Sequence, residues 1–216
     1  MEGFEALGAE VAINEDHYLI KAKKLKGCMY FFSNVSVTAT ESMILAATLA
    51  EGTTTLKNCA MEPEIVALTD YLNKVGAKII GAGSPTIIIE GVKSLNATNF
   101  EIIPDRIETG TFAIMAALTQ SNFTITNCNP NHIESLLNIF SKQGIPYKKT
   151  NSTLNIIPSN NDIKAYNIKT HEYPGFPTDL QPPYTVLATQ THGNTLIHET
   201  IYDRRLLYTE MLVQMG

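Results

Sequence analysis

Apolar and polar positions follow a pattern that occurs three times along this chain. Two runs rich in Ala, Met and Leu, Ser42 to Ala50 and Thr111 to Thr119, are apolar around most of a helical circumference and predict largely buried helices. After the first helix of each copy comes a short segment in which apolar and polar residues alternate and β-branched residues are frequent, which predicts a half-buried strand. These segments are TTTLKN, NFTITN and NTLIHE.

A second, more polar helix is predicted after each of these strands. These helices are expected over Pro63 to Val75, Pro130 to Gln143 and Arg204 to Met215. In the complete copies two more strands follow, and AKIIGAG and PTIIIEGV around Gly81 to Pro85 predict a hairpin. One unit is therefore predicted to be β-α-β-α-β-β, which places the chain in the α/β (α+β) class.

Comparison of the sequence with itself shows that one supersecondary unit is repeated, with a period of ~70 residues. The Asn-Cys pairs that begin at Asn58 and Asn127 are 69 residues apart. Glycines expected just past helix ends are separated by 68, 68 and 72 residues, at Gly8, Gly76, Gly144 and Gly216. This period exceeds that of common helical repeats, so each unit must contain more than a pair of helices alone.

The chain begins and ends inside a unit. Its opening GFEALGAEV has the pattern of the last turn of a second helix, and Gly216 precedes any closing hairpin. Repeats bury their apolar faces against neighbouring repeats, so incomplete units leave apolar surface uncovered. We hypothesise that the chain is an internal piece of a longer enzyme, or that its terminal half-units pair with each other or with another copy.

Composition and charge exclude several classes of protein. The 216 residues are 44% hydrophobic and 17% charged, which is typical of a globular protein and not of a disordered, collagen-like or coiled-coil chain. The length fits one large domain or two incomplete ones. The formal net charge of −5 disfavours general binding to nucleic acid or anionic membranes, which requires excess Lys and Arg. Without an export signal or a long apolar run, a cytoplasmic location is expected.

Cysteine and histidine do not indicate a metal site. Three cysteines, Cys28, Cys59 and Cys128, are too few and too irregularly spaced for a disulfide framework or a zinc site. Cys59 and Cys128 end equivalent strands, where a free cysteine acts as a small apolar residue. The five histidines share no metal-binding spacing, so no metal or cofactor is expected.

Residues suited to chemistry stand at the start of each first helix. The segment from Asn34 to Val37, the pair Asp105 and Arg106, and the pair Thr178 and Asp179 occupy equivalent positions. A strand-to-helix junction offers free N–H groups to anions such as phosphate, although Ser, Thr and Asp also serve there as ordinary helix caps. Arg106 is no cap, and Asp179 stands between prolines, where a rigidly held carboxylate could act as a general base toward a hydroxyl.

Longer motifs extend these observations. They are PDRIETGTFAIMAAL at Pro104 to Leu118, PGFPTDLQ at Pro174 to Gln181, LAEGTT, EPEIV and the ETIYDRRLLYTEMLVQMG tail. Together they resemble the UDP-N-acetylglucosamine 1-carboxyvinyltransferase family of enolpyruvyl transferases, and the likeness spans nearly the whole chain. The resemblance implies two domains, each an inside-out α/β barrel of three repeated units, with residues 1–103 in the first and 104–216 in the second.

The family resemblance also implies a reaction and its substrates. The enolpyruvyl group of phosphoenolpyruvate is transferred to the 3-hydroxyl of UDP-N-acetylglucosamine, the first committed step of peptidoglycan synthesis. The segment that holds the UDP part in the family is matched by Asn34, Val35, Ser36 and Val37. Asn34 replaces a lysine that is usual in the family.

Catalytic and other substrate-binding roles are implied in the same way. Asp179 matches the aspartate that contacts the sugar 3-hydroxyl and acts as base on it. Ile201 matches an apolar backbone contact to the substrate, and Arg205 matches an arginine of the interdomain cleft. Asp105 and Arg106 match the pair where the chain passes between domains. We therefore expect Asp179 and Arg205 to face one crevice.

Some family groups have no counterpart in this sequence: an N-terminal Lys-Asn pair, a mobile loop with the reactive cysteine and nearby arginines, and C-terminal arginines. These groups would polarise phosphoenolpyruvate and protonate its methylene carbon, so the chain alone is not expected to turn over. Two alternatives remain open. One is a segment of 5-enolpyruvylshikimate-3-phosphate synthase, which shares the fold, and the other is a non-catalytic repeat module that binds a nucleotide or a partner chain.

Overall fold

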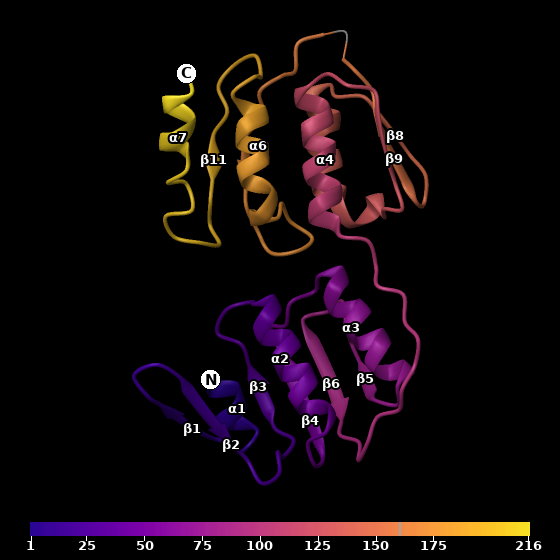
Figure 1. Cartoon of the computed structure of the whole chain (residues 1–216), viewed down its shortest axis with the longest axis vertical. Coiled ribbons are helices and arrows are strands. Elements are labelled where there is room, and N and C mark those ends of the chain that lie inside the picture. Colours follow the sequence, from indigo (N-terminus) through magenta and orange to yellow (C-terminus); the bar gives the residue numbers. More distant parts are fainter. Residues whose placement is uncertain (160) are drawn as a thin grey trace. The chain divides into compact units, whose positions relative to one another are not determined.

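The computed structural model describes residues 1–159 and 161–216. These residues form two compact units, Met1–Ile103 (unit 1) and Pro104–Gly216 (unit 2) (Figure 1). Each unit encloses its own hydrophobic core. The assignment of the units to the two domains of an enolpyruvyl transferase stays a prediction.

Unit 1 contains a four-stranded sheet, a separate hairpin and the helices that pack on them. In chain order its elements are α1 (Glu2–Ala6), β1 (Glu10–Ile13), β2 (Tyr18–Lys21), β3 (Met29–Phe31), α2 (Val37–Thr48), β4 (Thr53–Lys57), α3 (Pro63–Lys74), β5 (Lys78–Ile80) and β6 (Thr86–Glu90).

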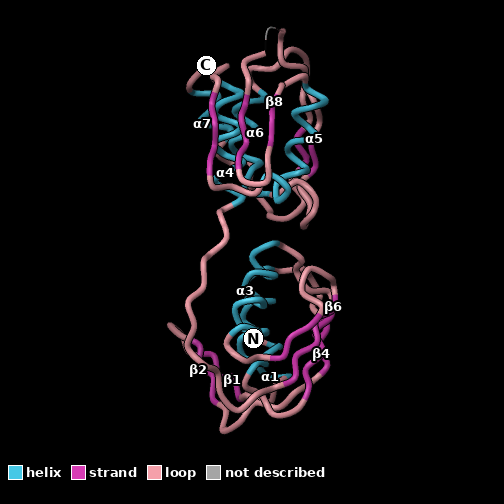
Figure 2. The backbone as a smooth tube through the Cα atoms, turned by 90° about the vertical axis from the view of Figure 1, so that its right-hand side faces the viewer, coloured by secondary structure: helices cyan, strands magenta, loops and turns pink. Residues whose placement is uncertain are grey.

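The main sheet of unit 1 has the order β3-β4-β6-β5. Strand β3 runs parallel to β4, whereas β6 is antiparallel to both β4 and β5, with Leu56 opposite Ile87 and Ile79 opposite Ile89. Side chains alternate across the sheet, and these four residues are buried. Helix α2 contacts β6 and α3 contacts β5, and the side view shows α3 on one face of β4 and β6 (Figure 2).

Unit 2 repeats the same kinds of element. In chain order they are α4 (Arg106–Leu118), β7 (Phe123–Thr126), the 3₁₀ turn η1 (Pro130–Ile133), α5 (Glu134–Gln143), β8 (Tyr147–Lys149), β9 (Thr153–Ile156), β10 (Ile168–Lys169), the 3₁₀ turn η2 (Thr178–Leu180), α6 (Gln181–Ala188), β11 (Ile197–His198) and α7 (Thr209–Gln214). Strands β7, β9 and β8 form an antiparallel sheet, and β10 pairs in parallel with β11.

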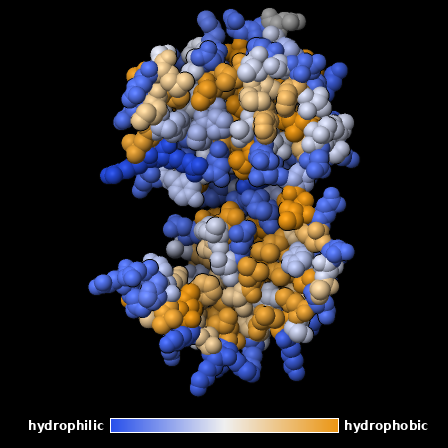
Figure 3. Space-filling view, in the orientation of Figure 1, coloured by the Kyte–Doolittle hydropathy of each residue, from blue (hydrophilic) through white to orange (hydrophobic). Residues whose placement is uncertain are grey.

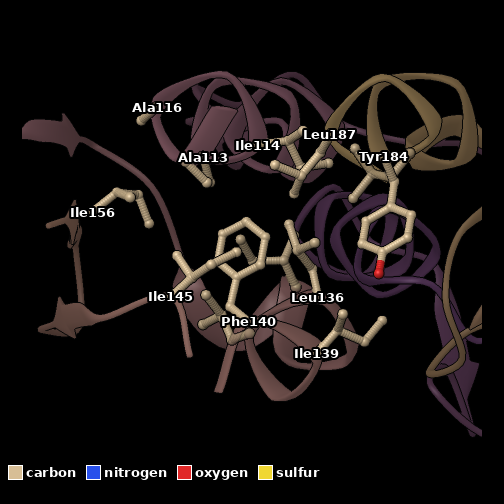
Figure 4. Close-up of a cluster of buried hydrophobic side chains, with 14 of the residues drawn as sticks. Ala113, Ile114, Ala116, Leu136, Ile139, Phe140, Ile145, Ile156, Tyr184 and Leu187 are labelled. Atoms are coloured by element: carbon tan, nitrogen blue, oxygen red, sulfur yellow. The ribbon is translucent and has the colours of Figure 1, made fainter. Parts of the chain in front are cut away.

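The core of unit 2 joins α4, α5 and α6 to the β7-β9-β8 sheet. Figure 4 shows Ile114 and Leu187 above Phe140 and Leu136, with Ile156 on the sheet side. The Tyr184 ring is fully buried in the same cluster, and its hydroxyl donates a hydrogen bond to the Tyr166 carbonyl at 2.9 Å. The ring therefore contributes apolar packing while its one polar group stays satisfied.

The element order matches the predicted repeat, except that, among the described residues, no strand lies between β6 and α4 to open the second copy. Unit 1 contains one complete β3-α2-β4-α3-β5-β6 copy, preceded by α1-β1-β2, and unit 2 contains α4-β7-α5-β8-β9 followed by β10-α6-β11-α7. The parallel pair β3-β4 of one copy has its equivalent in β10-β11. The glycines predicted to end helices all have positive φ, at Gly8, Gly76, Gly144 and Gly216.

Two predicted helix entries are confirmed: α2 begins at Val37, within the segment from Asn34 to Val37, with Ser36 as its cap, and α4 begins at Arg106 with Asp105 as its cap. Two boundaries nearer the C-terminus were wrong. The last helix begins at Thr209 and not at Arg204, whose φ of 59° is left-handed and cannot continue a helix. Strand β11 covers only two residues of NTLIHE.

Both units expose large apolar side chains. Figure 3 shows apolar surface over unit 1, and the exposed residues of this unit include Ile13 and Leu19 of the β1-β2 hairpin. Helix α7 contains no buried residue, and Met211 and Val213 are exposed on it. The half-units at both ends thus have uncovered apolar side chains, and their pairing with other repeats stays a prediction. No helix in the described part of the chain is long and apolar enough to cross a membrane.

Candidate active site

The predicted site residues of unit 2 stand on three segments that lie at one end of the unit. The N-terminal ends of α4 and α6 are found there, together with the connection from β11 to α7 (Figure 1). Arg106 opens α4, Asp179 lies in η2 just before α6, and Ile201 and Arg205 follow β11. Residues that are far apart in the sequence are thus collected on loops and helix starts, where functional residues are commonly found.

Asp179 and Arg205 form a direct ion pair. Arg205 Nη2 donates to Asp179 Oδ1 at 2.6 Å, and the Arg205 guanidinium lies 5.1 Å from the centroid of the Tyr202 ring. The side chains of Asp179 and Arg205 are 55% and 27% exposed, so both can be reached from solvent. Solvent-exposed pairs of this kind contribute only ~0–1 kcal/mol, and other contacts must therefore hold the two segments in place.

The turn that carries Asp179 is anchored on both sides by buried apolar residues. Phe176 and Leu180 are almost fully buried, and Thr170 forms a parallel bridge with Phe176. On α4, a Cβ atom added to Gly110 would lie 2.5 Å from Leu180 Cδ1. Glycine at this position therefore lets the turn pack directly on the helix. Asp179 makes no capping bond, and its carboxylate is directed to Arg205.

The carboxylate of Glu199, just after β11, connects three segments of this site. Its Oε1 accepts hydrogen bonds from Thr170 Oγ1 at 3.0 Å and from the backbone N–H groups of Ile201 at 2.8 Å and Tyr202 at 3.2 Å. Its Oε2 accepts a bond from Thr178 Oγ1 at 2.8 Å. Burial acts to raise the pKa of Glu199, but these four bonds outweigh burial and bring the pKa below its ordinary value.

A second polar cluster anchors the far end of the same connection. Gln181 Nε2 donates to the Tyr208 hydroxyl at 2.6 Å, and that hydroxyl donates to Thr185 Oγ1, also at 2.6 Å. Gln181 and Thr185 are buried on α6. The segment that carries Arg205 is consequently attached through Glu199 at its start and through Tyr208 at its end.

Arg106 and Asp105 have different local roles at the start of α4. Asp105 Oδ1 accepts hydrogen bonds from the N–H groups of Ile107 at 2.7 Å and Glu108 at 3.1 Å, so Asp105 is an ordinary helix cap. Arg106 is the first residue of the helix, and its guanidinium lies 5.8 Å from the centroid of the Tyr173 ring. Tyr173 precedes the turn of Asp179, so this contact joins two of the three segments.

The predicted UDP-binding segment lies in unit 1, at the start of α2. Asn34 is exposed, whereas Val35 and Val37 are half-buried and pack against the core of the unit. Ser36 is the N-cap of α2, and its Oγ accepts a bond from Ala39 N–H at 3.3 Å. Capping, which the sequence left open as the alternative, is therefore a demonstrated role of Ser36.

The three thiols lie outside this site and are not activated. Cys59 is 1% exposed, and burial raises the pKa of its thiol to about 11, although a hydrogen bond from the backbone of Ile87 acts in the opposite direction. Burial also raises the pKa values of Cys28 and Cys128. Such thiols stay protonated at neutral pH and are poor nucleophiles. Within the described residues, no group of three or more His, Cys, Asp or Glu side chains is arranged to hold a metal ion.

Glu199 and Tyr208 were not predicted as members of the site. Glu199 opens the ETIYDRR motif, and its two threonine donors precede it in the chain by 29 and 21 residues. The ETIYDRR motif indicates that this segment contributes to the site. The partners of the Glu199 carboxylate could not be predicted, because they lie on other segments that only the fold brings together.

Solved structures share this fold over 91% to 100% of the chain. The enolpyruvyl transferase NikO from Streptomyces tendae matches with a TM-score of 0.89 at 20% identity, covering 100% of this chain and 54% of that one. An EPSP synthase from Acinetobacter baumannii matches with a TM-score of 0.62 at 19% identity, over 91% of this chain and 46% of that one. The fold is therefore that of the enolpyruvyl transferases.

Sequence relatives narrow this class. Residues 1–216 match the family described as EPSP synthase (3-phosphoshikimate 1-carboxyvinyltransferase), and the chain belongs to that family. It is 43% identical to the UDP-N-acetylglucosamine 1-carboxyvinyltransferase of Desulfosudis oleivorans and 44% identical to that of Halothermothrix orenii. All of this chain aligns in both cases, and it spans 52% of each relative.

Proposed function

We propose that this chain supplies part of the active site of an enzyme that transfers the enolpyruvyl group of phosphoenolpyruvate to the 3-hydroxyl of UDP-N-acetylglucosamine. The observation that carries the proposal is the Asp179–Arg205 pair, 2.6 Å apart on two anchored segments. Relatives at 39–44% identity, all named UDP-N-acetylglucosamine 1-carboxyvinyltransferase, support this choice of substrate.

Asp179 is the general base of the proposed reaction. Its carboxylate takes the proton of the sugar 3-hydroxyl, and the hydroxyl oxygen forms a bond to C2 of phosphoenolpyruvate while a proton is added to C3. In the second step phosphate leaves from C2 and C3 loses a proton, which restores the double bond. The exposed half of the Asp179 side chain gives the hydroxyl access to the base.

Arg205 provides positive charge beside this base. A guanidinium can donate two parallel hydrogen bonds to a phosphate or carboxylate oxygen pair, and both groups are present in phosphoenolpyruvate. Stacking on Tyr202 and pairing with Asp179 limit the orientations of the guanidinium before the substrate arrives. Such preorganisation lowers the cost of stabilising charge in the transition state.

The remaining contacts belong to the same proposal. Asn34, Val35, Ser36 and Val37 hold the UDP part, Arg106 and Ile201 contact the substrate, and the two units are parts of two inside-out α/β barrels. Because the groups expected to protonate the methylene carbon were not found in this sequence, we expect this chain to bind substrate rather than to complete turnover.

Substrate binding tests the proposal. We expect UDP-N-acetylglucosamine to raise the melting temperature of the chain more than UDP alone does, because only the sugar reaches Asp179, and a ligand that binds the folded state stabilises it. In Asp179→Asn the difference between the two ligands should shrink. Asp70→Asn, an exposed substitution on α3, is the matched control and should behave as the wild type.

Shikimate 3-phosphate separates the proposal from its alternatives. The family description and the Acinetobacter structure favour a shikimate enzyme as the second candidate. A rise in melting temperature with shikimate 3-phosphate and none with UDP-N-acetylglucosamine would establish that candidate instead. No rise with either ligand would contradict both and leave a non-catalytic module.

A further inference from the structure

We propose that Glu199 is a positioning residue, which holds the backbone segments of Asp179 and Arg205 so that the two side chains meet. The juxtaposition is direct. One carboxylate accepts hydrogen bonds from Thr178, the residue before Asp179, and from Ile201 and Tyr202, which begin the segment that leads to Arg205. The effect on ligand binding rests on the proposed function, whereas the effect on the ion pair does not.

The bonds of Glu199 bring β10, η2 and the segment after β11 together at one carboxylate. Thr170, just after β10, is completely buried, and its Oγ1 donates to Glu199 while accepting a bond from Thr200 N–H at 2.8 Å. Thr200 Oγ1 in turn donates to the Thr170 carbonyl at 2.6 Å. The start of the Arg205 segment is thereby fixed to β10, and the second oxygen of Glu199 extends the connection to η2.

The hydrogen bonds of Glu199 and the Asp179–Arg205 ion pair differ in their exposure to solvent, and this difference indicates which of them holds the segments in place. The Asp179–Arg205 pair is open to solvent, where a competing water or ion can replace either partner. Glu199 is partly buried and accepts four bonds, two of them from backbone N–H groups that have fixed directions. Bonds to an ionised acceptor are about twice as strong as neutral ones. The ion pair therefore forms between segments that Glu199 already holds.

A graded series of variants tests the positioning role. Glu199→Leu removes all four bonds at similar volume, Glu199→Gln keeps the shape but removes the charge, and Thr178→Val removes only the bond that reaches η2. Thr178→Ser retains the hydroxyl and should restore wild-type behaviour. Glu134→Gln, an exposed substitution at the start of α5, controls for the loss of one negative charge in the same unit.

The first measurement is the ¹⁵N NMR signal of the Arg205 side chain in the whole chain. In the wild type and in Thr178→Ser, a held guanidinium should show slow rotation and slow hydrogen exchange. We expect both to become fast in Glu199→Leu and intermediate in Thr178→Val. Unchanged Arg205 signals in a folded Thr178→Val and in Glu199→Gln would overturn the proposal, even if Glu199→Leu fails to fold.

The second measurement is the affinity for UDP-N-acetylglucosamine by calorimetry. We expect affinity to fall about tenfold in Glu199→Gln and about threefold in Thr178→Val, in line with the loss of charge-assisted and single hydrogen bonds. Thr178→Ser and Glu134→Gln should stay within about twofold of the wild type. Altered Arg205 signals without any wild-type affinity for this ligand would reject the proposed function and still support positioning by Glu199.

Discussion

At the scale of single residues, unit 2 contains a carboxylate, that of Glu199, whose hydrogen bonds all come from the protein's own segments. Glu199 is partly buried, which alone would favour its neutral form, and yet hydrogen bonds to its ionised form dominate. By comparison, the side-chain oxygens of Ser36 and Asp105 accept hydrogen bonds from N–H groups of the helices that they cap. Residues that occupied equivalent positions in the repeat thus have unequal roles, and only Asp179 is left to pair with an arginine.

The lowered pKa of Glu199 predicts a pH dependence. A carboxyl whose pKa is lower in the folded state stabilises the protein above the unfolded value, near 4.5, and loses that contribution as pH falls through the folded pKa. The free energy of unfolding should therefore differ most between wild type and Glu199→Gln above pH ~4.5, and the difference should shrink toward pH 3. Urea denaturation across this range measures it. A difference that grows on acidification would have the wrong sign.

At the scale of elements, the contact between α4 and η2 decides where Asp179 lies. Thirteen residues form α4, and the glycine in its second turn is the position where the Leu180 side chain rests. Helix propensity disfavours glycine inside a helix by about 1 kcal/mol relative to alanine. Its presence here is explained by the packing of η2 and not by the helix itself.

Gly110→Ala tests this account. Propensity alone predicts a gain of about 1 kcal/mol, whereas a Cβ atom 2.5 Å from Leu180 Cδ1 predicts overpacking that costs roughly 1–3 kcal/mol. We expect a net loss of stability in urea denaturation. Leu180→Ala alone should cost about 2–5 kcal/mol. The double variant should lose less stability than the sum of the two single losses, because the new methyl group at position 110 then occupies space that the Leu180 side chain has vacated. If the two losses simply add, the contact between residue 110 and Leu180 does not explain the loss of stability in Gly110→Ala.

At the scale of the whole molecule, each unit has a hydrophobic core of its own. The buried residues of one core all belong to unit 1, and those of the other all belong to unit 2. Ile87 is fully buried in unit 1 and Ile156 in unit 2. Separate cores permit each unit to open without the other, since cooperativity follows the contacts that are lost together.

A reciprocal pair of core variants examines this independence. Ile87→Ala and Ile156→Ala each remove a buried side chain at a cost of about 2–5 kcal/mol. Hydrogen exchange should show lost protection of unit 1 in the first variant and of unit 2 in the second, with the other unit unaffected. Loss of protection throughout the chain in either variant would mean that the units unfold as one.

The sequence by itself determined the repeat, the order of its strands and helices, and the helix-ending glycines such as Gly76 and Gly144. These features are local, because apolar periodicity and backbone preference act within a few residues. It also singled out Asp179 and Arg205 as candidates through motifs. The entries of α2 and α4 were predicted at residues that precede their apolar runs, whereas the last helix was predicted to begin too early, at Arg204.

Only the tertiary structure decided which of these residues meet. Asp179 and Arg205 are 26 residues apart, and Thr170 and Glu199 are 29 apart, so no local pattern records their contact. The contacts exist because η2 packs on Gly110 and the β10-β11 pair brings Thr170 beside Glu199. Burial and hydrogen bonding then set the pKa of Glu199, and both depend on the distances between segments that only folding fixes.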